Sequence, residues 1–223
     1  MLLDDHVEAL LEKYVKNNSI VSFGTGKLNE LFLKKLAVYA EKNDLKIKVI
    51  PTSHKLAELC GALKIETASL DDSDIDIAFD FVDMADADFN YISNETTSLI
   101  RDKMIAQNAG EMIVVCEEKN FVEKLGGKIC LEVNPFAINK TILQIMNLGD
   151  AKIKTNGEKP MLSETGNYFV ELDLDNIYSL DDLEFQAKQI PCVLETSVFV
   201  GYADRVITHG EKVMVKSRMT NQE

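Results

Sequence analysis

A short glycine-containing run near the amino terminus has the composition of an anion-binding turn. Residues 23–27 have the sequence FGTGK and follow a short apolar stretch. Glycines let the backbone turn sharply and point amides outward, and a following helix adds the positive end of its dipole. An anion suits that position, with Thr25 or Lys27 able to touch it. The run completes neither a Walker A motif nor a dinucleotide-binding fingerprint, so a tight turn without a ligand remains the alternative.

Carboxylates supply a second kind of chemistry. Asp80 and Asp83 come directly after an apolar run, where they can hydrogen-bond sugar hydroxyls or hold a base in place. Asp102 lies well inside a segment with helical spacing, where a carboxylate on the inner face can act as a base. The alternative for all three is a solvated acidic surface, because the formal charge of the chain is −13.

The elements that would position these residues alternate between strand and helix. After a first helix over residues 2–16, apolar runs predict strands over 19–23, 45–50, 76–79 and 111–116. Helical spacing predicts helices over 28–41, 54–63, 94–108 and 119–125. This alternation predicts an α/β fold, a Rossmann-like and mostly parallel sheet flanked by helices. The carboxyl ends of its strands would gather the glycine run and the aspartates at one edge.

The pattern changes after residue 128. Strands are predicted over 129–133, 151–154, 168–174 and 193–200, with helices over 136–147 and 180–189. The order β-α-β-β-α-β predicts a smaller ferredoxin-like α+β domain over residues 129–200. Residues 205–209 and 212–216 flank Gly210 as a terminal hairpin that can return to the first sheet. Residues 1–128 and 201–223 would then form the α/β domain.

Composition narrows the class of partner and compartment. The charge of −13, without a run of five Lys or Arg residues, disfavours nucleic acid and anionic membranes. No apolar stretch is long enough to span a bilayer, and the first residues do not form a signal peptide. Four cysteines without a C-x-x-C pair predict free thiols in a reducing cytoplasm, and three scattered histidines disfavour a metal site.

An ordered set of motifs resembles the ribose-5-phosphate isomerase A family. The family motifs G-T-G-S-T, P-T-S and D-G-A-D-E correspond to residues 24–28, 51–53 and 80–84. The K-G-G-G-G…R-E-K segment falls on residues 93–103, and the S-K pair on 118–119. The later motifs T-D-x-G-N and I-P-G-V-x-E-x-G-x-F fall on residues 163–167 and 190–199. The set covers nearly the whole chain with natural spacing.

The resemblance implies an aldose–ketose isomerase that needs no cofactor and no metal. It would interconvert ribose 5-phosphate and ribulose 5-phosphate through an enediolate, as in the pentose phosphate pathway. Asp102 would be the base, and Asp80 and Asp83 would position the sugar. The resemblance places substrate binding on Gly24, Thr25, Gly26, Lys27, Leu28, Ser93, Asn94 and Lys119. It also implies a homodimer or homotetramer in the cytoplasm.

Departures from the family motifs leave the activity open. Asp102 replaces a glutamate, so its oxygens retreat by ~1 Å, a misplacement that can cost about a hundredfold in rate. Ser93 replaces a lysine and removes a cation, while Lys27 can restore one at the phosphate cradle. Three glycines are replaced by Asn94, Glu95 and Thr96, which add bulk and a charge.

Three functions are therefore weighed. The first is the isomerase, with a lower rate or a shifted substrate. The second is a non-catalytic protein that binds a sugar phosphate or regulates through it. The third is a coenzyme A transferase on a related architecture, disfavoured because no glutamate has a recognisable nucleophile setting. The first two require the loops of Gly24, Asp80, Ser93 and Asp102 to converge on one pocket at the carboxyl edge of one sheet.

Overall fold

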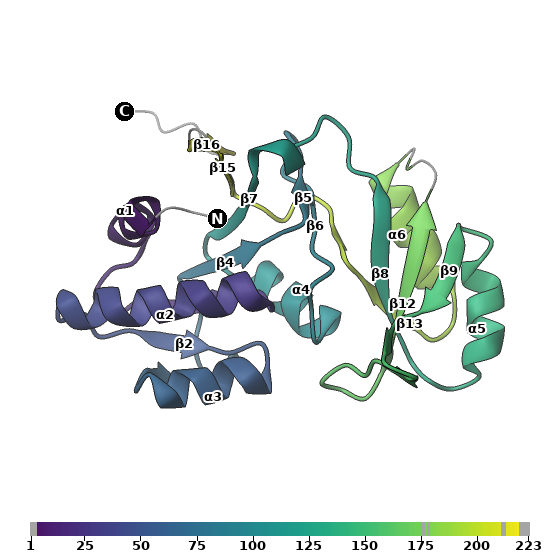
Figure 1. The fold of residues 1–223 in the computed structure, drawn as a ribbon, viewed down its shortest axis with the longest axis horizontal. Helices are drawn as coiled ribbons and strands as arrows, with labels where there is room; N and C mark the ends of the chain where they lie inside the picture. The colour runs from purple at the N-terminus through teal and green to yellow at the C-terminus, as the bar shows by residue number, and fades with distance from the viewer. Residues whose placement is uncertain (1–3, 175–176, 178, 211–212, 219–223) are drawn as a thin grey trace.

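The larger of two layered units is built on a seven-stranded sheet. In this computed structural model, which describes residues 4–174, 177, 179–210 and 213–218, its strand order is β16-β15-β7-β4-β1-β2-β3. The strands are β1 (Ile20–Phe23), β2 (Lys48–Ile50), β3 (Glu66–Thr67), β4 (Ile77–Phe81), β7 (Met112–Glu117), β15 (Arg205–His209) and β16 (Met214–Ser217). All neighbours pair in parallel except β15 and β16, which form an antiparallel hairpin. Figure 1 shows this sheet beside the second unit.

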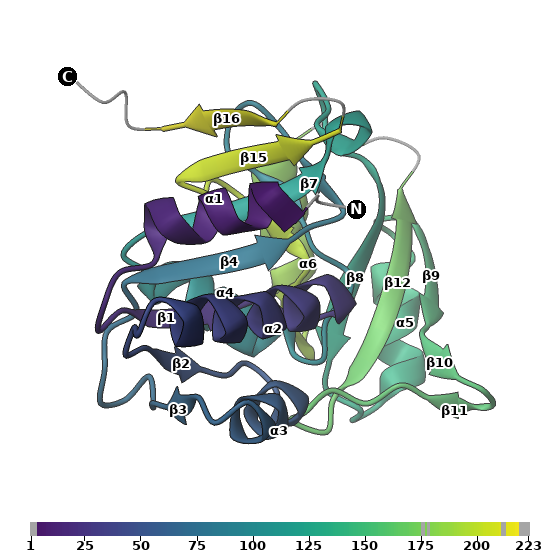
Figure 2. The same cartoon turned by 60° about the vertical axis from the view of Figure 1, so that its left-hand side comes forward.

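Helices cover both faces of this sheet because its strands are apolar on both faces. The helices are α1 (Asp4–Tyr14), α2 (Lys27–Lys42), α3 (His54–Ala62) and α4 (Leu99–Asn108). Residues of α1, α2 and α3 pack with β1 and β4 in the core on one face of the sheet. Residues of α4 pack with β4 and β7 in a second core, on the other face. Figure 2 shows α1 and α2 in front of β4, with α4 behind it.

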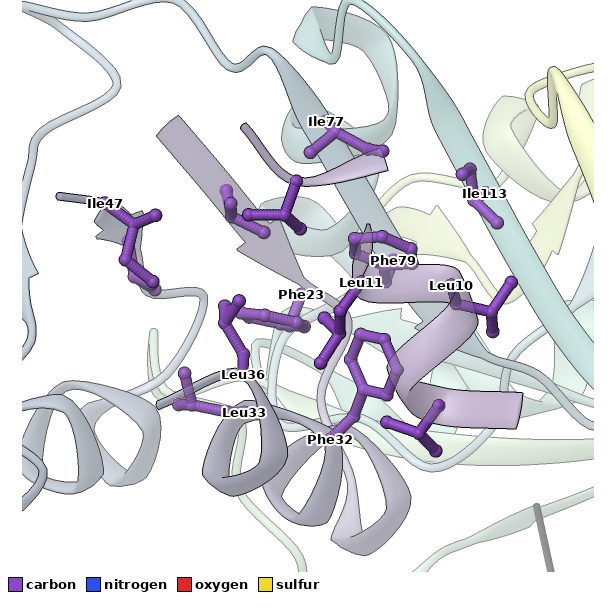
Figure 3. Packing of buried hydrophobic residues seen from close by; sticks show 14 of the residues in the cluster. Leu10, Leu11, Phe23, Phe32, Leu33, Leu36, Ile47, Ile77, Phe79 and Ile113 are labelled. Atoms are coloured by element: carbon purple, nitrogen blue, oxygen red, sulfur yellow. The ribbon is translucent and has the colours of Figure 1, made fainter. Parts of the chain in front are cut away.

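Aromatic rings fill the core beneath α2. The ring centroids of Phe32 in α2 and Phe79 in β4 lie 4.9 Å apart, and the Phe23 ring packs against both. Figure 3 shows these rings with Leu10 and Leu11 of α1 closing over them. Because each large apolar side chain contributes about 1.5–3 kcal/mol when buried, this cluster fixes α2, and with it the turn at its start, onto the sheet.

The second unit is an antiparallel four-stranded sheet with the order β13-β8-β12-β9. Its elements run as β8 (Gly127–Val133), α5 (Ile138–Ile145), β9 (Asp150–Ile153), β12 (Tyr168–Leu174), α6 (Leu180–Gln189) and β13 (Val193–Thr196), with the hairpin β10 (Thr155–Asn156) and β11 (Lys159–Pro160) inserted before β12. This is the predicted β-α-β-β-α-β arrangement. Apolar residues of α5 and α6 pack on one face of the sheet. The other face, through Cys130 and Phe169, meets Leu99 at the start of α4.

A small third sheet joins the two units. It has the order β14-β6-β5, from β5 (Met84–Ala85), β6 (Tyr91–Ile92) and β14 (Val198–Phe199). The strand predicted over 193–200 is wrong as one strand. It breaks at Ser197, whose N–H donates to Cys130 O at 2.8 Å, and its two halves enter different sheets. The division at residues 128 and 201 remains a predicted domain boundary.

Other predicted bounds also change. The helix predicted over 119–125 is wrong: only the 3-10 turn η1 (Glu118–Asn120) forms. Val122 N–H instead donates to Ala85 O at 2.9 Å, which holds the segment against β5. The helix predicted over 94–108 begins at Leu99, because Ser98 is its cap and accepts from Arg101 N–H.

The terminal hairpin returns to the first sheet as predicted, with β15 parallel to β7. Lys212, the predicted start of its second strand, lies outside the described residues, and β16 starts at Met214. All four cysteines are free thiols, as predicted. In the described part of the chain, no helix combines the length and apolar character needed to cross a membrane.

Candidate active site

Two parallel strands bring Gly24 against Asp80. Phe23 of β1 lies opposite Phe79 of β4, and Gly24 N–H donates to Phe79 O at 2.8 Å. A Cβ atom on Gly24 would overlap the Asp80 carboxylate. Glycine is therefore required here by the close approach of a side chain from the neighbouring strand.

Asp80 is buried and held by polar partners. Asn29 of α2 donates to Asp80 Oδ1 at 2.8 Å, and the same amide nitrogen donates to Thr25 O at 3.1 Å. Asn29 Oδ1 accepts from Phe81 N–H at 3.2 Å, so this one side chain joins β4 to the glycine turn. Burial, and to a lesser extent Asp83, raise the pKa of Asp80 to about 6, although hydrogen bonds from Asn29 and Ser93 act in the opposite direction.

Asp102 connects α4 to two loops. Its side chain is only 6% exposed. Thr25 Oγ1 donates to Asp102 Oδ1 at 3.2 Å, and Thr96 Oγ1 donates to Asp102 Oδ2 at 2.5 Å. Burial, followed by the charge of Asp80, raises the pKa of Asp102 to about 8, against the two hydroxyl hydrogen bonds. A perturbed, buried carboxylate beside a second one is the setting of a general acid or base.

The loop over residues 93–97 is anchored on both sides. Asn94 N–H donates to Asp83 Oδ2 at 2.6 Å, and Asn94 Oδ1 accepts from Ser197 Oγ at 2.7 Å. Asn94 Nδ2 donates to Lys128 O at 3.1 Å. The Asn94 side chain therefore ties the loop to the second unit, through Lys128 and Ser197. The backbone N–H of Asn94 holds the exposed carboxylate of Asp83.

A carboxylate of the chain itself lies at the start of α2. Gly26 is the N-cap, with a φ of 129° and no side-chain capping bond. Glu95 Oε1 accepts from Lys27 N–H at 3.3 Å, and a Cβ atom on Gly26 would lie 3.0 Å from the Glu95 carboxyl carbon. Lys27 and Leu28 are exposed there, and Thr25 is buried beneath them.

Lys119 stands apart from these contacts. It lies in η1, at the end of β7 that is next to β4 in the sheet. Its side chain is exposed and forms a 2.6 Å ion pair with Glu117. Lys119 thus lies at the same sheet edge as Asp80, but its charge is paired with Glu117 at the end of the adjoining strand β7.

A fully buried carboxylate, Glu132, was missed by the sequence analysis. It accepts from Thr165 Oγ1 at 2.8 Å, Asn167 Nδ2 at 2.9 Å and Ile100 N–H at 3.3 Å. Its place at the amino-terminal end of α4 satisfies a free helix amide. The available signal was a lone glutamate in the apolar run of residues 129–133, together with the motif at residues 163–167.

Ion pairs hold α4 against the second unit. Lys103 is 4% exposed and pairs with Glu184 of α6 and with Glu195 of β13, the latter at 3.1 Å. Its ammonium also lies 5.0 Å from the centre of the Phe199 ring. On the other side of the helix, Arg101 pairs with Glu164 at 3.3 Å. The orientation of Asp102 on α4 therefore depends on ion pairs between this helix and the second unit.

The four segments that the sequence analysis required to converge come together in the fold, while a single pocket lined by all of them stays a prediction. Gly24 touches Asp80, Thr25 hydrogen-bonds Asp102, and Ser93 lies near enough to Asp80 to lower the pKa of that carboxyl. They meet beyond the carboxyl ends of β1 and β4, on the side where the arrow of β4 points toward the smaller sheet in Figure 2. Neutral and ionised carboxylates side by side, with an amide-lined turn next to them, can move a proton on a small anionic substrate.

Comparison with known proteins agrees with this geometry. Residues 48–212 match the family model of ribose 5-phosphate isomerase A (phosphoriboisomerase A). The chain belongs to the ribose-5-phosphate isomerase A family. The ribose-5-phosphate isomerase A of Picrophilus torridus is 34% identical over 194 residues, covering 86% of this chain and 86% of the relative.

Solved structures of the family superpose on nearly the whole chain. Ribose 5-phosphate isomerase A of Methanocaldococcus jannaschii matches with a TM-score of 0.87 and 28% identity, over 95% of this chain and 96% of that one. A D-ribose-5-phosphate isomerase in complex with phospho-erythronic acid matches with a TM-score of 0.88 and 27% identity, over 96% and 97%. Family and fold are as the motif order predicted.

Proposed function

We propose that this chain interconverts ribose 5-phosphate and ribulose 5-phosphate, with Asp102 as the base that carries the proton between C2 and C1. The observation that supports this most is the hydrogen bonding of Asp102 to both Thr25 and Thr96, beside Asp80. These contacts support a proton-carrying role for Asp102 beside the glycine turn. Membership of the family supplies the reaction class.

The environment of Asp102 suits a base that works near neutral pH. Burial and Asp80 raise the pKa of Asp102 to about 8. A base with a raised pKa takes a carbon-bound proton more readily than an ordinary carboxylate does, and at pH 7 about a tenth of it is ionised. Removal of C2–H gives an enediolate, and return of the proton to C1 gives the ketose.

The remaining site residues receive supporting roles in this proposal. Gly24, whose own N–H is taken by Phe79 O, permits the close turn, and amides of Thr25 and Gly26, with Lys27 and the start of α2 at Leu28, bind the phosphate. Asp80 and Asp83 accept hydrogen bonds from sugar hydroxyls. Ser93 and Asn94 shape the wall of the site, and Lys119 adds positive charge at the same sheet edge. We further propose that the chain acts in the cytoplasm and forms a homodimer or homotetramer. Light scattering after size exclusion measures the molar mass and so tests the oligomeric state.

A direct assay separates catalysis from binding alone. Purified protein is mixed with ribose 5-phosphate, and the ketose formed is followed over time. Turnover that is lost in Asp102→Asn supports the isomerase. The replacement of the family lysine by Ser93, which removes a cation from the site, is the observation that favours a non-catalytic sugar-phosphate-binding protein. Thermal stabilisation by ribose 5-phosphate with no turnover would support that second function instead.

A further inference from the structure

The start of α2 holds an anion that belongs to the chain. Lys27 N–H donates to Glu95 Oε1 at 3.3 Å. The Glu95 carboxyl carbon lies 3.0 Å, and Oε2 3.1 Å, from the position a Cβ atom on Gly26 would take. Glu95 comes from the loop before α4, 68 residues further along the chain. A carboxylate from another element therefore takes the position of a capping group on this helix.

We propose that Glu95 is a specificity-determining residue that occupies the phosphate cradle of the free protein and is displaced by a phosphorylated substrate. This inference rests on the proposed function, because the cradle is the phosphate site only in that account. Glu95 would act as an internal competitor. It raises the phosphate concentration needed to fill the site and admits strong, doubly charged anions in preference to weak ones.

Electrostatics make the two anions exclusive. The free amides and the dipole at a helix start favour one negative charge near them. A phosphate monoester carries nearly two charges at neutral pH, so it binds such a site more strongly than a carboxylate does. Two anions sharing one cradle repel each other at short range. The second carboxylate in the first turn, Glu30, is already paired with Lys55 at 2.5 Å and does not compete.

The loop lets Glu95 move without disturbing the base. Asn94 is fixed by Asp83 and Ser197, and Thr96 is fixed by its hydrogen bond to Asp102. The Glu95 side chain between them is exposed. A change of its side-chain rotamer therefore opens the cradle while the backbone of the loop and the hydrogen bond to Asp102 stay in place.

The test compares phosphate binding in Glu95→Gln and Glu95→Gly with the unmodified chain. Isothermal titration with inorganic phosphate gives the Kd, and ribose 5-phosphate kinetics give KM and kcat. Glu41→Gln is the matched control, since Glu41 is an exposed carboxylate near the other end of α2. We expect the two Glu95 variants to bind phosphate at least about threefold more tightly, with a similar fall in KM and a smaller change in kcat.

The outcomes are distinct from those of the proposed function. Phosphate affinity that is unchanged or weaker in both Glu95 variants overturns the role of Glu95, as does an equal gain in Glu41→Gln. Absence of phosphate binding in every variant overturns it as well. Absence of turnover in the unmodified chain rejects the isomerase but leaves the comparison of phosphate affinities to decide the role of Glu95.

Discussion

The hydroxyl of Thr96 donates a 2.5 Å hydrogen bond to Asp102 Oδ2. In the family motifs, a glycine stands at the position of Thr96 and a glutamate at the position of Asp102. In this chain a threonine and the shorter acid stand at those two positions. Thr96 thus fixes the orientation of Asp102 and limits how far its pKa rises.

Replacing Thr96 with valine removes that hydrogen bond at nearly constant volume. Because the bond lowers the pKa of Asp102, its loss should raise that pKa and shift the pH–rate profile to higher pH. We expect kcat at pH 7 to fall about tenfold, because a smaller fraction of the base is ionised and it is less well oriented.

Thr97→Val is the matched control for this change. The Thr97 hydroxyl is buried and has no hydrogen-bond partner among the described residues, so its removal should leave the rate unchanged and the free energy of unfolding equal or slightly higher. An equal loss of rate in both variants would show that the loop, rather than the bond to Asp102, is responsible.

The two site carboxylates should make stability depend on pH. The pKa values of Asp102 and Asp80 are raised, to about 8 and about 6, so the folded state binds protons that the unfolded state has released above about pH 4. The free energy of unfolding therefore falls as pH rises between about 4 and 8. Asp102→Asn should be more stable than the unmodified chain at pH 8, on the order of 1–3 kcal/mol, and nearly equal to it at pH 4.

Urea unfolding at pH 4, 6 and 8 measures this difference. The paired comparison at each pH cancels the other titrating groups. A stability difference that does not change with pH would mean that Asp102 titrates alike in the folded and unfolded states.

The buried ion pairs of Lys103 should matter more than an exposed pair nearby. Lys103→Met leaves Glu184 and Glu195 without their buried cation and should lower the free energy of unfolding by about 3–5 kcal/mol. Lys188 also pairs with Glu195 at 3.0 Å but is about two-fifths exposed, so Lys188→Met should cost at most about 1 kcal/mol. Equal losses in chemical denaturation would contradict a central role for Lys103 in fixing α4.

Local sequence patterns predicted helices and strands correctly where hydrophobic period and capping residues indicated the same element. The strand over 168–174 and the helix over 180–189 form with the predicted bounds, because period and capping agree there. The helix predicted over 119–125 failed because Val122 pairs with Ala85, a partner that helical spacing alone cannot indicate. The meeting of Gly24 and Asp80 followed from strand ends that share one edge, whereas Asp102 reaches them from α4.

The polar contacts of the site were beyond sequence reasoning. Asn29 is 51 residues from Asp80, and Glu132 is 33 residues from Thr165. Nothing local distinguishes Asn29 from other polar residues of an amphipathic helix, and Glu132 interrupts an otherwise apolar strand. Such partners are determined by how the two units pack, which only the tertiary structure reveals.

The pH dependence of isomerisation by the unmodified chain and by Asp102→Asn tests the central claim most directly. The account predicts that kcat/KM of the unmodified chain for ribose 5-phosphate rises with pH and levels off above about 8, the raised pKa of Asp102. It predicts that Asp102→Asn loses at least about a hundredfold in kcat at every pH. A folded Asp102→Asn protein with a rate within about threefold of the unmodified chain would contradict the assignment of Asp102 as the base.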